Sequence, residues 1–408
     1  MRDIKLVASN RWPSDVVCSS RGETPAGRQP GETRQPWPPL MEYLLSLAGS
    51  PMFPTRPFLI RSIWLSSLGL LSVARAAAGQ CVTKPSSCRE LITVRRGHSG
   101  IVVYANRPLT APSDTVTRAI VVLHGAGSSG RFEFRSVLAS TFLSGNVANT
   151  LVVAPHFASN DGAACKDSIA VNELNWNCDV AAGDWRMGGR ARNDSTLSSF
   201  DAVDAILLAI ANKTLFPNLS SIVVAGHSAG GQLVTLYQAV NQIDEKLGVP
   251  TSYVVANASA YAYLDGRRPT PVRSASSNGP PRFEFNPFVN ASGCPSYARW
   301  PFGLDDRTGY AARLSVSQLK ENVARRPVTY LLGDADTVTA SGGFFGSCAA
   351  MAQGGNRQAR GMAFAQYASE FSPEHRHKVI IVDGCGHDAR CIFTSDDALP
   401  ALFPKVPR

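Results

Sequence analysis

Residues 221–231 read SIVVAGHSAGG, and this stretch decides the fold. The apolar, β-branched run 222–225 is typical of a strand buried on both faces, and it ends abruptly at a glycine-flanked serine, Ser228. Gly226 and Gly230 lack the Cβ atoms that would clash in a tight turn. The stretch predicts a serine held on a sharp turn between a strand and an amphipathic helix that begins near Gly230.

Outside this turn, short apolar runs alternate with helical patterns from about Gly79 onward. The runs expected as strands are 101–104, 119–123, 151–154, 222–225, 253–256, 328–332 and 379–382, and the expected helices are 200–211, 232–242, 315–324 and 362–369. This order predicts an α/β protein with a doubly wound, mostly parallel sheet flanked by helices, in one domain over 79–408. Two irregular stretches, 158–195 and 265–312, interrupt the alternation; they are either lid-like insertions or plain surface loops.

A serine hydroxyl becomes a good nucleophile only when a base takes its proton and an acid orients that base. His387 is the expected base, because it follows the strand 379–382 on a glycine-containing turn that can fold back toward Ser228. The strand 328–332 is followed by two carboxylates. Asp336 is preferred as the orienting acid because it lies further from the strand end, whereas Asp334 could cap the loop by accepting backbone hydrogen bonds.

A fourth element is the sequence His124-Gly-Ala-Gly, which directly follows the expected strand 119–123. Acyl transfer places negative charge on the former carbonyl oxygen, and backbone N–H groups held in advance can stabilise it. The amides of Ala126 and of Ala229, the residue after the nucleophile, are the expected oxyanion hole. An HGxG turn alone could also be a simple tight bend.

Together the HGAG turn, the GHSAGG elbow, the GDAD loop and the GCGH loop resemble the α/β-hydrolase superfamily, in its chain order Ser, Asp, His. The resemblance covers about 102–403. It implies an esterase, lipase or related acyl hydrolase that forms an acyl-enzyme and needs no cofactor. The turn differs from the HGGG type of many lipases and esterases, and the two insertions match no particular subfamily, so the resemblance does not specify the substrate.

The N-terminal part differs in composition from the hydrolase-like part. Residues 1–51 are rich in Pro, Gly, Arg and Ser and are expected to be disordered or an extension of the gene model. Residues 52–78 have basic residues, then a short apolar run, then small residues, which is the order of a secretory signal peptide. Translation would then start at Met52 or Met41. A genuine N-terminal tail with a weak membrane anchor or a buried apolar helix is the alternative.

The cysteines favour an oxidising compartment. Nine are present, and setting aside Cys18 leaves an even set of eight with no metal-binding spacing. We expect four disulfides, which pair Cys81 with Cys88, Cys165 with Cys178, Cys294 with Cys348 and Cys385 with Cys391. Buried reduced thiols in a cytosolic enzyme are the alternative. We expect no metal ion and no cofactor.

Five N-x-S/T triplets add to the secretory indication. Glycosylation is expected at Asn193, Asn212, Asn218 and Asn290, and least at Asn257, which lies close to an expected strand end.

Composition excludes several classes of protein. With 408 residues, 44% hydrophobic and 17% charged, the chain is neither disordered nor fibrous. The formal charge of +9 comes from scattered basic residues, so no nucleic acid is expected as a partner. The apolar run within 52–78 is too short for a transmembrane helix, so no stable membrane anchor is expected. The sequence predicts a secreted serine esterase that acts on a small-molecule or polymeric ester. A serine peptidase, a polyester depolymerase and an inactive binding protein are the alternatives.

Overall fold

The structure, a computed structural model, describes residues 80–82, 87–95, 99–161, 165–177, 184–272, 281–339, 343–372, 374 and 376–405. The chain divides into two units, Met1–Ser72 and Val73–Arg408. The tail 1–51 and the predicted signal peptide 52–78 both lie outside the described residues. Every described helix and strand belongs to the second unit.

The centre of this unit is an eight-stranded sheet in the order β1-β2-β4-β3-β5-β6-β9-β10. Its strands are β1 Arg89–Arg95, β2 Ser99–Ala105, β3 Arg118–Leu123, β4 Thr150–His156, β5 Ser221–His227, β6 Thr251–Ala256, β9 Val328–Gly333 and β10 His377–Val382. The pairs β1–β2 and β2–β4 are antiparallel, and the remaining neighbours are parallel. The predicted α/β class and the mostly parallel sheet are confirmed.

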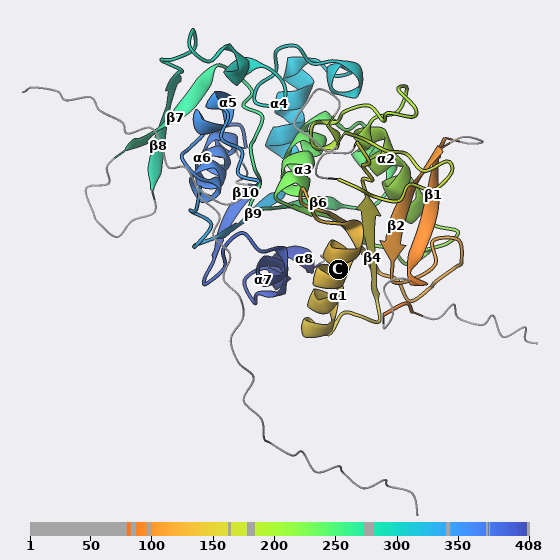
Figure 1. Cartoon of the computed structure of the whole chain (residues 1–408). Coiled ribbons are helices and arrows are strands. Elements are labelled where there is room, and N and C mark those ends of the chain that lie inside the picture. Colours follow the sequence, from red (N-terminus) through yellow and green to blue (C-terminus); the bar gives the residue numbers. More distant parts are fainter. Residues whose placement is uncertain are drawn as a thin grey trace, which may run out of the picture. The chain divides into compact units, whose positions relative to one another are not determined.

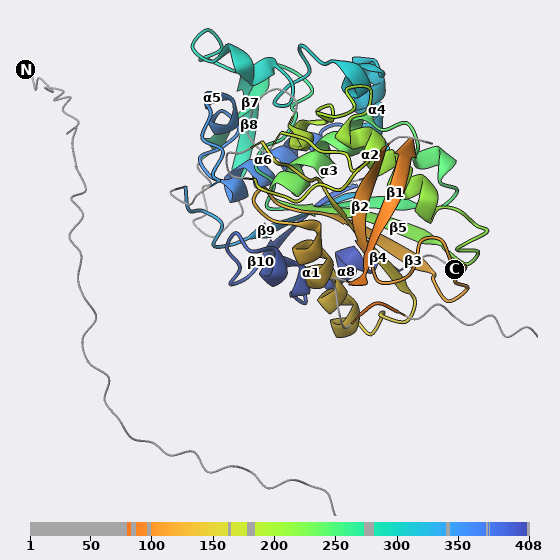
Figure 2. The ribbon, with the colours of Figure 1, turned by 45° about the vertical axis from the view of Figure 1, so that its right-hand side comes forward.

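Helices cover both faces of the sheet. They are α1 Gly130–Leu143, α2 Ser199–Ile210, α3 Ala229–Val240, α4 Val316–Arg325, α5 Cys348–Met351, α6 Arg357–Ser369, α7 Ala389–Thr394 and α8 Leu399–Leu402. Figures 1 and 2 show α1, α7 and α8 on one face, with α2, α3, α4 and α6 on the other. None of the described helices combines the length and apolar character needed to cross a bilayer.

The central strands are buried on both faces because their alternate side chains enter two different cores. In β3, Ile120 and Val122 pack with α1 and α7, whereas Val121 and Leu123 pack with α2 and α3. Each fully buried side chain of this size stabilises the fold by about 1.5–3 kcal/mol. Continuous apolar runs in the sequence therefore mark these strands better than alternation does.

Helix α3 differs from its prediction. The sequence predicted an amphipathic helix, but every residue of α3 is buried. The reason is its position, because α3 packs against β5 and β6 on one side and is covered by α4 and the 3-10 helix Trp185–Met187 on the other. Its N-terminus follows Ser228 directly, so the packing of α3 fixes the position of the turn.

The sequence also missed several elements. The edge strand β1 has the sequence RELITVR. Its exposed polar residues differ from the continuous apolar runs expected of buried strands, so the sequence did not predict it. The insertion 265–312, predicted to be irregular, contains the hairpin of β7, Arg267–Val272, and β8, Arg282–Pro287. Pro269 and Pro271 in β7 argued against a strand, but a two-stranded ribbon leaves one edge unpaired and so tolerates proline.

Three disulfides join the pairs that the sequence proposed: Cys81 with Cys88, Cys294 with Cys348, and Cys385 with Cys391. Cys165 is disulfide-bonded as well, and Cys178, its proposed partner, lies outside the described residues. The bond from Cys385 to Cys391 ties the loop after β10 to α7. That loop carries His387.

Candidate active site

Ser228 lies on a strained turn between β5 and α3. Its φ of 57° and ψ of −114° are rare for a residue with a side chain, which is typical of a nucleophile elbow. A Cβ on Gly226 would lie 2.4 Å from the carbonyl carbon of Gly230, and one on Gly230 would lie 2.2 Å from the carbonyl oxygen of Leu123. Only glycine fits at both positions, so the turn is as tight as the sequence indicated.

The structure brings Ser228, His387 and Asp336 into one chain of hydrogen bonds. His387 Nδ1 lies 2.8 Å from Asp336 Oδ2, and His387 Nε2 lies 2.9 Å from Ser228 Oγ. Because a carboxylate only accepts, the neutral ring carries its hydrogen on Nδ1 and donates it to Asp336. Nε2 is then free to accept the hydroxyl hydrogen of Ser228. The Asp336 side chain is 1% exposed and that of His387 is 25% exposed.

Asp334, the alternative acid, does not contact His387. Its amide donates to the carbonyl of Val382, and its buried Oδ1 has no hydrogen-bond partner among the described residues. The loop-capping role suggested for its side chain is therefore not seen at Oδ1. Instead, the amide of Asp336 donates to Gly333 O, which turns the loop so that the Asp336 carboxylate lies against His387.

The HGAG turn lies against the nucleophile. A Cβ on Gly125 would be 3.4 Å from Ser228 Cβ, and Gly127 has a φ of 69°. The amides of Ala126 and Ala229 have no hydrogen-bond acceptor among the described residues. Two such donors, one of them at the N-terminus of α3, are suited to hold a negatively charged oxygen.

Two buried side chains support this turn. His124 donates from Nδ1 to Gly125 O at 2.8 Å and accepts at Nε2 from the Phe157 amide at 3.0 Å. Burial lowers the pKa of His124 to about 3, so the ring stays neutral and acts as a brace. Glu133 of α1 accepts from the Gly125 amide at 3.4 Å, and burial raises the pKa of its carboxyl group to about 8. The sequence did not single out Glu133.

His227, within the elbow, is a neighbour of the base. Its ring centroid lies 4.6 Å from that of His387, and its Nε2 is buried without a hydrogen-bond partner in the described part of the chain. Burial, followed by the charges of His387 and Arg357, holds the pKa of His227 well below its usual value. The ring is therefore a neutral packing group beside the base.

Asn257 connects the loops that carry the acid and the base. Its Oδ1 accepts from the Gly333 amide at 2.9 Å, and its Nδ2 donates to Gly386 O at 3.0 Å. The side chain is fully buried, with a φ of 44°. In the sequence Asn257 was visible only as a glycosylation triplet near a strand end. Burial removes its amide from any modifying enzyme in the folded state.

The four asparagines at which glycans are expected are all exposed: Asn193, Asn212, Asn218 and Asn290.

Helix α6 also holds the acid loop. Gln358 donates from Nε2 to Gly333 O at 3.2 Å and to Asp334 O at 3.0 Å. The guanidinium group of Arg357, 1% exposed, lies 3.5 Å from Asp336 Oδ1. No sequence motif indicated either residue, because the contacts join segments that only the fold brings together.

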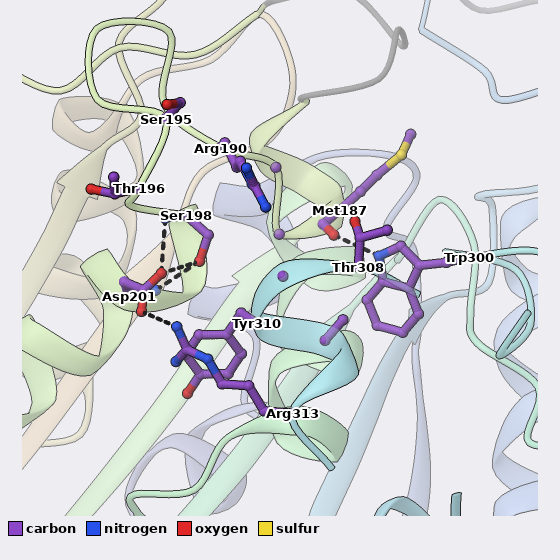
Figure 3. Close-up of a pocket in the computed structure, with 14 residues that line it drawn as sticks. Met187, Arg190, Ser195, Thr196, Ser198, Asp201, Trp300, Thr308, Tyr310 and Arg313 are labelled. Atoms are coloured by element: carbon purple, nitrogen blue, oxygen red, sulfur yellow. Dashed lines mark hydrogen bonds and ion pairs between the residues drawn. The ribbon is translucent and has the colours of Figure 1, made fainter. Parts of the chain in front are cut away.

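The two predicted insertions meet away from the triad. Trp300 Nε1 donates to Met187 O at 2.8 Å and ties them together. Between them lies a cavity of about 710 Å³, whose lining includes Arg190, Asp201 and Arg313 (Figure 3). Ser228, Asp336 and His387 are not among the residues that line this cavity.

Among the described residues, no group of three or more His, Cys, Asp or Glu side chains could hold a metal ion.

Comparison with known proteins agrees with this architecture. The model of a family described as "Alpha/beta hydrolase family" matches residues 120–401. The solved structure of poly(aspartic acid) hydrolase-1 from Sphingomonas sp. KT-1 is similar, with 20% identity, coverage of 74% of this chain and 94% of that one, and a TM-score of 0.50. At this identity the likeness concerns the fold alone.

Two further solved structures are more distant. A poly(3-hydroxybutyrate) depolymerase from Bordetella parapertussis has 19% identity, coverage of 78% of this chain and 91% of that one, and a TM-score of 0.49. An S-formylglutathione hydrolase from Agrobacterium tumefaciens has 15% identity, coverage of 76% and 92%, and a TM-score of 0.40. No curated protein sequence matches this chain.

Proposed function

Because the chain belongs to the alpha/beta hydrolase family, we propose that it is a serine hydrolase that cleaves carboxylic esters through an acyl-enzyme intermediate. One observation carries the proposal: the unbroken hydrogen-bond chain from Ser228 Oγ through His387 to Asp336. Each link has the distance and the donor direction that proton transfer from the hydroxyl needs.

In the first half of the reaction, Ser228 Oγ attacks the ester carbonyl while His387 Nε2 takes the hydroxyl proton. Asp336 stabilises the resulting imidazolium and keeps Nδ1 facing it. The negative oxygen of the tetrahedral intermediate is held by the amides of Ala126 and Ala229. His387 then gives its proton to the leaving alcohol, and the acyl group stays on Ser228.

In the second half, water replaces the alcohol. His387 Nε2 takes a proton from water, and the hydroxide attacks the acyl-enzyme carbonyl. The same two amides hold the second oxyanion. Collapse of this intermediate releases the carboxylic acid and returns the proton from His387 to Ser228 Oγ. Apart from the ester and water, these steps use only groups of the chain itself.

The proposed setting is extracellular. Disulfides at Cys81–Cys88, Cys294–Cys348 and Cys385–Cys391 support an oxidising compartment. The proposal includes a signal peptide at 52–78, a hydrolase domain at 79–408 and glycans on the four exposed asparagines. The substrate is a small-molecule or polymeric ester.

The test uses Ser228→Ala in the full chain. The control is Ser317→Ala, at an exposed position of α4. We expect Ser228→Ala to lower kcat/KM for p-nitrophenyl acetate by at least about 10⁴-fold with an unchanged melting temperature. A fluorophosphonate probe should label the wild type and Ser317→Ala but not Ser228→Ala. An unlabelled wild type would identify an inactive binding protein, and retained turnover in Ser228→Ala would refute the nucleophile.

A substrate panel then separates the remaining alternatives. It contains soluble esters of increasing acyl length, a solid aliphatic polyester and a p-nitroanilide peptide. The proposal expects ester cleavage to exceed anilide cleavage in kcat/KM; faster anilide cleavage would identify a peptidase, and preference for the solid polymer would identify a depolymerase.

A further inference from the structure

Arg357 gives the acid of the triad a second, positively charged partner. Arg357 is the first residue of α6, and its guanidinium group is 1% exposed. The two oxygens of Asp336 are divided between two partners: Oδ2 faces His387 Nδ1 at 2.8 Å, and Oδ1 faces Arg357 Nη1 at 3.5 Å. The carboxylate thus bridges an imidazole and a guanidinium group in the interior.

The surroundings of Arg357 leave its charge dependent on this carboxylate. Arg357 Nη2 donates to Gly343 O at 3.0 Å, the guanidinium carbon lies 5.3 Å from the centre of the Phe344 ring, and Nε has no hydrogen-bond partner in the described part of the chain. Burial lowers the pKa of Arg357, and the charge of Asp336 opposes this shift. A buried cation without an anion is costly, so Asp336 is what makes the charge tolerable.

We infer that Arg357 is a positioning residue of the triad: it holds Oδ1 of Asp336, keeps Oδ2 turned to His387, and places a positive charge that opposes the imidazolium form of His387. The inference rests on the proposed function. It extends the triad to a fourth side chain, supplied by α6 rather than by a loop at the end of a strand.

The other charged or titratable groups around His387 come from several elements. His227 of the elbow packs against its ring, and Asp388 follows it in the chain. Tyr261, after β6, is close enough to Asp336 for that charge to contribute to its raised pKa. Glu133 of α1 faces Asp388. None of these side chains is substituted in the test. The charge of Arg357 also contributes to the lowered pKa of His227, so its removal changes the electrostatics at both histidine rings.

The direction of the effect follows from the sign of the charge. A buried cation repels the imidazolium form of His387, so its removal lets the base take up a proton at higher pH. The guanidinium group and the imidazole contact opposite oxygens of one carboxylate, at 3.5 and 2.8 Å. Two charges that close interact appreciably at an effective dielectric of about 20, and water at the partly exposed ring screens part of this interaction. We expect the acid limb of the kcat/KM profile to move up by about one pH unit.

Arg360 provides a matched control. It lies one turn along α6, its guanidinium carbon is 4.8 Å from the centre of the same Phe344 ring, and it is fully buried. It donates to the carbonyls of Gly354 and Ser259 and to Met351 Sδ, and none of these acceptors is a carboxylate. Its loss disturbs the packing around Phe344 as the loss of Arg357 does but leaves Asp336 with its cation.

The experiment compares wild type, Arg357→Gln, Arg357→Lys and Arg360→Gln in the full chain. Turnover of p-nitrophenyl acetate is measured between about pH 5 and 9, and circular dichroism and melting temperature report folding. We expect Arg357→Gln to move the acid limb up by about one unit and to lower the plateau of kcat/KM about tenfold. Arg357→Lys and Arg360→Gln should keep the wild-type limb within about 0.3 unit.

An unmoved limb in folded Arg357→Gln overturns the inference, and so does an equal shift in Arg360→Gln. If the glutamine variant does not fold, Arg357→Met, an uncharged side chain of similar length, takes its place: a limb that moves up by about one unit supports the role of the charge, and an unmoved limb overturns it. Fluorophosphonate labelling separates the two claims. If the wild type is not labelled, the proposed function is refuted. If the wild type is labelled but the acid limb of Arg357→Gln does not move, only the role of Arg357 is refuted.

Discussion

Replacing Asn257 by alanine should cost both stability and activity. The side chain accepts from the Gly333 amide and donates to Gly386 O in a fully buried position. Alanine removes both bonds. The buried Gly333 N–H is then left unpaired, whereas Gly386 O, which is half-buried, keeps its bond from the Asp388 amide. Gly333 leads into the acid loop and Gly386 directly precedes His387, so both halves of the His387–Asp336 contact lose a support.

The magnitude follows from these contacts. The unpaired Gly333 N–H costs about 1–3 kcal/mol, and the lost bond to Gly386 O costs about 0.5–1.5 kcal/mol. The φ of 44° adds about 1 kcal/mol, because asparagine tolerates this region better than alanine does. We expect the free energy of unfolding to fall by about 4 kcal/mol. A misplacement of the base or acid by about 1 Å lowers the rate by about 100-fold, so kcat should fall by a factor between about 10 and 100.

The assay combines urea unfolding with p-nitrophenyl acetate kinetics. Asn257→Gly removes the same bonds but relieves the backbone strain, so it should be about 1 kcal/mol more stable than Asn257→Ala. Asn241→Ala is the matched control. Asn241 is a fully buried asparagine with its own hydrogen bonds, at the other end of α3 from Ser228. The reasoning is refuted if Asn257→Ala unfolds within about 1 kcal/mol of wild type, or if Asn241→Ala loses as much kcat.

Two further substitutions test the support of the oxyanion turn. Gly230→Ala puts a Cβ 2.2 Å from Leu123 O, so the turn must move; we expect a loss of about 2 kcal/mol in stability and about 100-fold in kcat, whereas Gly355→Ala, in open space, should change neither. Equal kinetics for the two variants would contradict this. With the pKa of Glu133 raised from 4.5 to about 8, the native state holds a proton that the unfolded chain releases, so the free energy of unfolding falls as pH rises from 4.5 to 8. Glu133→Gln should make the free energy of unfolding less dependent on pH in this range. Urea unfolding at several pH values measures this, and the same pH dependence in both proteins would rule the effect out.

The strand ends of the sheet were predictable because parallel strands read as short apolar runs. The turns that follow β3, β5, β9 and β10 carry the HGAG sequence, Ser228, Asp336 and His387, and in a parallel sheet these ends share one edge. The order of the motifs along the chain was therefore enough to select the four loops that the structure brings together, and within the loop after β9 the sequence left two carboxylates open.

The supporting residues were not predictable in the same way. Asn257 resembled a glycosylation triplet, Glu133 lay in a stretch for which the sequence predicted no element, and Arg357 was one of many scattered basic residues. Nothing in their local sequence separates a buried partner of the site from a solvated side chain. Each becomes recognisable only through what it touches: the Gly333 and Gly386 loops, the Gly125 amide, and the Asp336 carboxylate.

Local rules decide the elbow, because backbone sterics at Gly226 and Gly230 and the apolar run before them are properties of neighbouring residues. They also select the kinds of residue that can act as nucleophile, base and acid. The choice of Asp336 over Asp334, and the addition of Arg357 from α6, depend instead on distances between segments far apart in the chain. Those distances follow from how the helices pack on the sheet, and the burial that packing creates gives each charge its effect.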